Sequence, residues 1–173
     1  MLTLLLLRHA KSDWNSTALD DHDRPLNPRG TKAAPIMGRY LAREGLKPDL
    51  ILCSEAVRTQ ATLALVLPEL GPPPPHVVFE EELYLARPET ILDVIKNNVE
   101  EATKSVMVIG HNPGLHALAL TLIRDGNKKE LQQLAMKFPT AALAVITFDT
   151  AHWPEIGLTI GNLASFVTPR EVN

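Results

Sequence analysis

Four short segments of the chain are almost continuously apolar instead of alternating between apolar and polar residues. They are Leu2–Leu7, Leu50–Leu52, Val77–Phe79 and Val106–Ile109. Continuous apolar segments of this length are typical of parallel strands that are buried on both faces of a sheet. We therefore expect these segments to form a mostly parallel sheet in the interior of the protein.

Between these strands, apolar residues recur at the spacing of an amphipathic helix. The pattern predicts helices over Arg29–Arg43, Ala56–Leu67, Pro88–Val99 and Leu115–Ile123. Asn27 and Pro28 suit the N-cap and first position of the first helix, and Pro35 predicts a kink in it or a later start. Strands that alternate with helices indicate an open three-layer α/β/α fold, in which helices cover both faces of the sheet.

The last part of the chain has a different pattern. Ala141–Phe148 and Gly157–Val167 resemble strands, and a turn containing Trp153 and Pro154 separates them without a helix. Strands that are this close in sequence pair antiparallel, so we expect an antiparallel C-terminal edge of the sheet. No linker or shift in composition divides residues 1–173, and their number is typical of one domain.

The composition argues against several classes of protein. A net charge of −3 disfavours a nucleic-acid-binding protein, which would present a basic face. The single cysteine, Cys53, excludes an intrachain disulfide and a cysteine-rich zinc site. Met1–Leu7 is too short to cross a membrane, which takes about 20 apolar residues, and it lacks the pattern of a secretory signal. We expect a cytoplasmic protein that binds neither nucleic acid nor membranes.

Arginine and histidine side chains follow three of the predicted strands. Arg8 and His9 follow the first strand, Arg58 lies in the helix after the second, and His111 follows the fourth within Gly110–Gly114. Each residue alone has an ordinary interpretation as a turn residue or a surface ion pair. Because ligands bind at the carboxyl ends of strands in open α/β sheets, their joint placement favours a common site.

The residue types at this predicted site indicate phosphate chemistry. A guanidinium group binds phosphate oxygens through two parallel hydrogen bonds, and a neutral imidazole can act as a nucleophile. Neighbouring guanidinium charges favour the neutral form of an imidazole. A rigid cationic site of this kind can stabilise a phosphoryl group in transfer without a metal ion. We therefore expect neither a metal nor a cofactor.

Motifs that flank the first predicted strand support this interpretation. Arg8-His9-Ala10 is similar to an Arg-His-Gly motif, with Ala10 in place of the usual glycine. Lys11–Asn15 is similar to a Glu-Ser-x-Trp-Asn motif, and Asp23–Gly30 to an Asp-x-x-Leu-x-x-x-Gly motif that precedes a helix.

Two further motifs follow in the same order. Ser54–Thr62 is similar to a Ser-x-x-x-Arg-x-x-x-Thr motif, and Gly110–Pro113 to a motif that carries a second histidine. In this order and spacing, the motifs resemble those of the histidine phosphatase superfamily, which includes the phosphoglycerate mutases. The resemblance covers about the first two thirds of the chain and implies a phosphoglycerate mutase-like fold.

The resemblance also implies roles for individual residues. His9 would be the nucleophile that becomes phosphohistidine, and Arg8, Arg58 and His111 would complete the phosphate pocket. Asn15 would be a further contact to the substrate. The second candidate for a further contact to the substrate is Asn112, which matches the second-histidine motif but is also suited to a turn.

The segment after the third strand distinguishes branches of this superfamily. In the mutases a long insertion there covers the site and carries an acidic residue, whereas Glu80–Ala86 here runs directly into the helix predicted from Pro88. This short segment and the Gly110–Gly114 turn resemble the SixA-type phosphohistidine phosphatases. The resemblance implies an open site and, as substrate and partner, phosphohistidine on a signalling phosphotransfer protein.

Three carboxylic acids are candidates for protonating the leaving group. Glu81 and Glu82 lie where the acid of the mutases would fall, and Asp13 is close in sequence to the nucleophile. The acidic run Glu80–Glu82 has an alternative interpretation as a solvated loop. Asp20–Asp23 lacks the ligand spacing of an established cation site, so we interpret it as a solvated loop as well.

Two alternative functions remain at this point. One is a small-molecule phosphomonoesterase or a phosphoglycerate mutase-like enzyme. The other is a protein without activity that binds phosphate or a phosphoprotein.

Overall fold

The computed structural model describes residues 1–15, 19–158 and 160–173. Within this part of the chain, seven strands form one sheet in the order β3-β2-β4-β1-β6-β7-β5. The strands are β1 (Leu2–Arg8), β2 (Leu50–Ser54), β3 (His76–Glu80), β4 (Ser105–Gly110), β5 (Ile123–Gly126), β6 (Leu143–Phe148) and β7 (Gly161–Val167). The helices are α1 (Pro28–Arg43), α2 (Val57–Val66), α3 (Pro88–Asn98), α4 (Gly114–Leu122), α5 (Lys128–Met136) and α6 (Pro169–Val172). No helix of the described residues is both long enough and apolar enough to cross a membrane.

The predicted parallel sheet is confirmed. Strands β3, β2, β4 and β1 pair in parallel. The antiparallel pairing of the two C-terminal strands is also confirmed, since β6 runs antiparallel to both β1 and β7. The edge itself differs from the prediction, because β5 pairs in parallel with β7 and lies outside it. Ile123 starts this strand and does not end the preceding helix, and β7 begins at Gly161 instead of Gly157.

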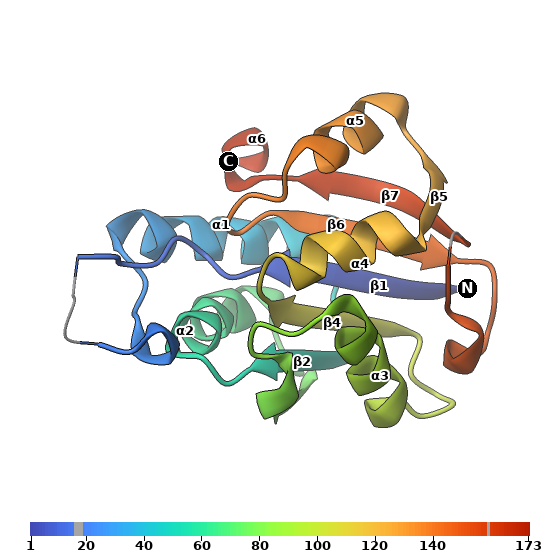
Figure 1. Ribbon diagram of the computed structural model, residues 1–173, viewed down its shortest axis with the longest axis horizontal. Helices are drawn as coiled ribbons and strands as arrows, with labels where there is room; N and C mark the ends of the chain where they lie inside the picture. The colour runs from blue at the N-terminus through green and yellow to red at the C-terminus, as the bar shows by residue number, and fades with distance from the viewer. Residues whose placement is uncertain (16–18, 159) are drawn as a thin grey trace.

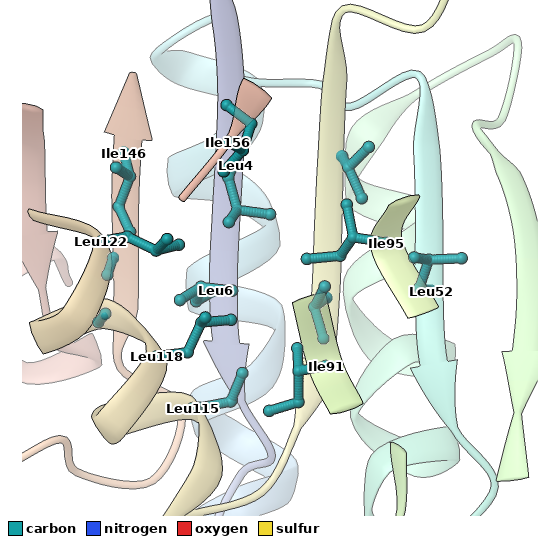
Figure 2. Close-up of a cluster of buried hydrophobic side chains, with 14 of the residues drawn as sticks. Leu4, Leu6, Leu52, Ile91, Ile95, Leu115, Leu118, Leu122, Ile146 and Ile156 are labelled. Carbon is teal, nitrogen blue, oxygen red and sulfur yellow. The ribbon is translucent and has the colours of Figure 1, made fainter. Parts of the chain in front are cut away.

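The sheet lies between two layers of helices, as predicted. Figure 1 shows α3 and α4 in front of the sheet and α1 and α2 behind it. Side chains of β1 alternate between the layers: Leu4 and Leu6 pack with α3 and α4, and Leu5 and Leu7 pack with α1 and α2. Figure 2 shows the first of these clusters. Burying a large apolar side chain contributes about 1.5–3 kcal/mol to stability, so this central strand needs an apolar residue at nearly every position.

The first helix runs without interruption through Pro35. The predicted later start of this helix is therefore wrong. Asn27 caps the helix as predicted, since its Oδ1 accepts a hydrogen bond of 2.9 Å from the backbone N–H of Gly30. A proline inside a helix costs about 3 kcal/mol. Buried residues on both sides of Pro35, including Ala34 and Met37, offset this cost by holding the helix against the sheet.

Backbone contacts beside β1 fix the segment that carries the candidate nucleophile. The N–H of His9 donates to the carbonyl of Gly110 at 3.1 Å, which joins the ends of β1 and β4. The N–H of Asn27 donates to the carbonyl of Lys11 at 2.9 Å. A Cβ on Gly30 would lie 2.2 Å from the same Lys11 oxygen, so the motif glycine is needed for this close approach.

Candidate active site

A cavity of about 230 Å³ lies at the carboxyl ends of β1, β2 and β4. The structure brings Arg8, His9, Arg58 and His111 together in its wall, as the strand-end rule predicts. The described residues that line the cavity are Arg8, His9, Lys11, Ser12, Trp14, Asp21, Arg24, Arg58, Leu85, His111, Asn112 and Thr140.

The His9 ring is held in one tautomer. Its Nδ1 lies 2.7 Å from the carbonyl oxygen of Ala10. Because a carbonyl oxygen only accepts hydrogen bonds, Nδ1 carries the proton and Nε2 carries a free lone pair. The side chain is buried and lines the cavity, and Nε2 is the ring nitrogen that can act as a nucleophile.

Arg58 holds the second histidine in the complementary tautomer. Its Nη2 lies 3.3 Å from His111 Nδ1, and a guanidinium only donates, so Nδ1 of His111 is the acceptor. The opposite ring nitrogen, Nε2, then donates to the hydroxyl of Ser54 at 2.8 Å. Thr62 connects helix α2, which carries Arg58, to the segment around His9. Its hydroxyl donates to the carbonyl of Arg58 and accepts from the N–H of Ala10. The Ser-x-x-x-Arg-x-x-x-Thr motif is therefore a set of residues that positions both histidines.

Two guanidinium nitrogens are buried without a hydrogen-bond partner among the described residues: Arg8 Nε and Arg58 Nε. Arg8 also donates through Nη1 to the carbonyl of Phe138 at 3.0 Å, so its side chain is fixed in place. Buried N–H groups are almost always paired in folded proteins, and leaving one unpaired costs about 1–3 kcal/mol. These two donors therefore indicate an anionic ligand with several oxygen acceptors, such as a phosphoryl group.

Both imidazoles are electrically neutral at neutral pH. Burial is the main cause that lowers the pKa of His9 to about 4, and the charges of Arg58, Arg8 and Arg24 add to it, against the hydrogen bond to Ala10. Burial, followed by the charge of Arg58, lowers the pKa of His111 to about 3. The site therefore keeps both imidazoles unprotonated over the whole physiological pH range.

These lowered pKa values predict how stability depends on pH. An imidazole has a pKa of about 6.5 in the unfolded chain, so below that pH protons bind the unfolded state more readily than the folded state. We expect the free energy of unfolding to fall as the pH drops from 6.5 towards 4, by about 1.4 kcal/mol per pH unit for each histidine at most. Urea denaturation at several pH values measures this slope. The His9→Asn variant should show a shallower slope, and equal slopes for variant and wild type would contradict the prediction.

Asp21 is a member of the site that the sequence did not reveal. It lies in a short 3₁₀ helix, Asp21–Asp23, and its Oδ2 accepts from Arg58 Nη2 at 3.0 Å and from the hydroxyl of Tyr84. Its Oδ1 accepts from Arg24 Nε at 3.1 Å. The interpretation as a solvated loop agrees with the exposure of this side chain, which is 41%, but it did not include these contacts. The i, i+3 spacing of Asp21 and Arg24 was the available signal, and it gave no indication of the contact with Arg58.

The Asp21 carboxylate is ionised at the rim of the cavity. Partial burial raises its pKa, but the hydrogen bond from Tyr84, the charge of Arg58 and the bonds from both arginines outweigh this and lower the pKa to about 2. Asp21 is therefore a hydrogen-bond acceptor at neutral pH and has no proton to donate. Among the described residues, no three His, Cys, Asp or Glu side chains gather closely enough to hold a metal ion.

Of the remaining predicted residues, only Asn112 is among the described residues that line the cavity. Asn112 lines it and donates to the carbonyl of Phe138 at 2.9 Å, while its Oδ1 is buried without a partner among the described residues. The other candidates are Asn15, Asp13, Glu81 and Glu82, and none of them lines the cavity. Their roles stay predictions.

The segment that follows β3 is short, as expected. Glu81 and Glu82 are exposed on a 3₁₀ helix, Glu81–Leu83, and α3 already begins at Pro88. From this segment Tyr84 reaches Asp21, and Leu85 lines the rim of the cavity.

Comparison with known proteins identifies the family. The sequence profile of the histidine phosphatase superfamily (branch 1) matches residues 4–84. An uncharacterised protein of Mycobacterium leprae is 35% identical over 168 residues, which cover 95% of this chain and 100% of that protein.

Two solved structures are similar over almost the whole chain. A candidate phosphohistidine phosphatase SixA from Agrobacterium tumefaciens has a TM-score of 0.80 and 32% identity, and the match covers 97% of this chain and 98% of that one. A second candidate SixA, from Nakamurella multipartitia, has a TM-score of 0.79 and 30% identity, with 97% and 96% coverage. The chain therefore belongs to the histidine phosphatase superfamily (branch 1) and has the SixA-like form of its fold.

Proposed function

We propose that the protein is a phosphatase that removes the phosphoryl group from phosphohistidine on a signalling protein, through a phosphohistidine intermediate at His9. The observation that carries this proposal is the fixed tautomer of His9, which leaves the Nε2 lone pair free on a ring that lines a cavity together with Arg8 and Arg58. Membership of the histidine phosphatase superfamily supports phosphatase activity. The similarity to two candidate phosphohistidine phosphatases supports the choice of substrate.

The reaction proceeds in two transfers. In the first, His9 Nε2 forms a bond to phosphorus while the phosphorus–nitrogen bond of the substrate breaks, and the bonding electrons leave with the substrate imidazole. In the second, a water oxygen forms a bond to phosphorus and the electrons of the Nε2–phosphorus bond return to His9. A proton of this water passes to the solvent or to a phosphate oxygen. Arg8 and Arg58 bind the phosphoryl oxygens and stabilise their charge throughout.

The ionised Asp21 favours a nitrogen leaving group. An alkyl phosphate releases an alkoxide, which needs a proton from an acid, and Asp21 has none to give at neutral pH. A phosphohistidine whose ring is protonated leaves as a neutral imidazole and needs no further proton. The Asp21 carboxylate at the rim of the cavity is placed to stabilise that imidazolium before the transfer.

The rim of the cavity is suited to a phosphate group carried on another protein. Trp14 and Leu85 line it, with 68% and 51% of their surface exposed, so no covering segment of the described chain encloses the phosphate site. A bulky phosphoprotein can therefore approach His9. The partner that we propose is a phosphohistidine-containing phosphotransfer protein.

Hydrolysis of two substrates, measured side by side with a chelator present, tests this function. The substrates are a phosphohistidine-bearing phosphotransfer domain and p-nitrophenyl phosphate, with the His9→Ala variant as control. We expect faster turnover of the phosphoprotein, and none in the variant. Turnover of p-nitrophenyl phosphate alone would favour a small-molecule phosphomonoesterase. Binding of phosphate without turnover of either substrate would favour a binding protein.

A further inference from the structure

A groove lined by basic side chains continues from the active site. Its volume is about 520 Å³, and Lys11, Arg29, Lys137 and Arg170 contribute four cations to its lining. Lys11 and Thr140 line both this groove and the active-site cavity, so the two are neighbours. We call this surface the basic groove.

The cations of the basic groove are not paired with carboxylates of the described residues. None of the four forms a salt bridge or a side-chain hydrogen bond with another described residue. The carboxylate of Glu171 also lines the groove and offsets one of the four positive charges, which leaves the lining with more positive than negative side chains. The whole chain carries a net charge of −3, so this local excess of positive charge is opposite to that of the molecule. Such a surface attracts an anionic ligand and orients it.

The wall between the basic groove and the nucleophile is rigidly anchored. The carbonyl of Phe138 accepts hydrogen bonds from the side chains of Arg8 and Asn112, at 3.0 and 2.9 Å. The N–H of Ala141 donates to the carbonyl of His9 at 3.0 Å. A ligand that lies along the groove is therefore held at a fixed position relative to the phosphate site.

The basic groove adjoins an apolar hollow. An adjoining hollow of about 150 Å³ shares Lys137 and Pro139 with the groove and is also lined by Phe166 and Met136. Met136 is 84% exposed, which is unusual for a large apolar side chain. A small anion would use only part of this surface. A peptide segment with acidic residues and one apolar side chain matches both the charge of the groove and the apolar lining of the hollow.

We propose that the basic groove binds the acidic segment that flanks the phosphohistidine of a protein substrate. This proposal rests on the phosphohistidine phosphatase function proposed above and adds the determinant that selects the partner. Lys137 and Arg170 pair with carboxylates of the segment, Met136 contacts an apolar side chain, and the phosphohistidine reaches His9 past Lys11 and Thr140. Because the contacts form before the chemical step, they lower KM and leave kcat unchanged.

A pair of synthetic phosphohistidine peptides tests this proposal. The two peptides differ only in that the residues flanking phosphohistidine are glutamate in one and glutamine in the other. We expect wild type to hydrolyse the glutamate peptide with about tenfold higher kcat/KM, through KM, and this preference to shrink as salt is added. In the double variant Lys137→Gln with Arg170→Gln the preference should disappear, while hydrolysis of phosphoimidazole stays within about twofold of wild type.

A matched variant controls for the loss of positive charge. Arg124→Gln with Lys128→Gln removes two exposed cations outside the groove and should keep the preference for the glutamate peptide. If wild type hydrolyses both peptides at equal kcat/KM, the proposal that the basic groove binds an acidic segment is overturned, and the proposed function is unaffected. Loss of the preference in both double variants would likewise overturn the proposal about the groove. Wild type that hydrolyses neither the peptides nor phosphoimidazole would overturn the proposed function and this inference together.

Discussion

Replacing His9 by asparagine should lower kcat by about 10⁴-fold or more, because the variant has no nucleophile for the phosphoryl group. The substitution keeps an amide N–H that can still donate to the carbonyl of Ala10, so the surrounding contacts are conserved. The remaining Arg8, Arg58 and His111 still bind phosphate, and KM should change far less than kcat. Steady-state hydrolysis of the phosphohistidine-bearing substrate measures both constants.

Trapping the intermediate separates a nucleophile from a residue that only binds substrate. Wild type mixed with phosphoryl-labelled substrate and quenched rapidly should carry label that is stable in alkali and lost in acid, as a phosphoramidate is. The His9→Asn variant should carry none. The exposed His152, replaced by asparagine, is the matched control and should be labelled like wild type. Label on the His9→Asn protein would show that another residue is the nucleophile.

The core of this fold could be predicted because its strands are buried on both faces. Leu2–Leu7 and Val106–Ile109 have few alternatives to a central strand, since an exposed apolar run of that length would cost several kcal/mol. Once these strands are parallel, their carboxyl ends coincide, and the placement of Arg8, His9 and His111 follows from the topology. The residue types at the site and their common location could therefore be predicted from the sequence.

The sheet edge was missed because its elements bury little. Helix α5 has one fully buried residue, Leu134, and β5 has none, so few positions of either segment have to be apolar. Both are held by partners far away in sequence; for example, a carboxylate oxygen of Glu130 accepts from the N–H of Phe166. Local patterns do not contain such contacts.

Asp21 was missed for a related reason. Asp20, Asp21 and Asp23 are all exposed, and the sequence gives the three residues the same acidic character. What distinguishes Asp21 is a contact with Arg58, which is 37 positions away. The basic groove has the same origin, since its four cations come from the chain before α1, from α1 itself, from the end of α5 and from α6. Side chains that converge from segments far apart in the sequence cannot be paired without the tertiary structure.

Replacing Arg58 by lysine should lower kcat/KM by about 10²- to 10³-fold, although the positive charge is retained. The guanidinium donates at once to the Asp21 backbone carbonyl at 2.7 Å, to the Asp21 carboxylate at 3.0 Å and to His111 Nδ1 at 3.3 Å. It also has a buried Nε–H without a partner among the described residues. A lysine ammonium is a single point and cannot reach all these positions. Hydrolysis of phosphoimidazole measures the loss, and Arg39→Lys, in an exposed ion pair with Glu69, is the matched control.

Two causes of this loss predict opposite results in a double variant. If Arg58→Lys acts by leaving the Asp21 carboxylate poorly paired, adding Asp21→Asn removes that charge and should restore most of the activity. If Arg58 acts on the phosphoryl oxygens, the double variant stays as slow as Arg58→Lys alone or becomes slower. We expect the second result, because Asp21 is 41% exposed and water can solvate its carboxylate, whereas Arg58 is buried and lines the cavity. If kcat/KM of the double variant recovers to within about tenfold of wild type, the main role of Arg58 would be to position Asp21 and not to bind phosphate.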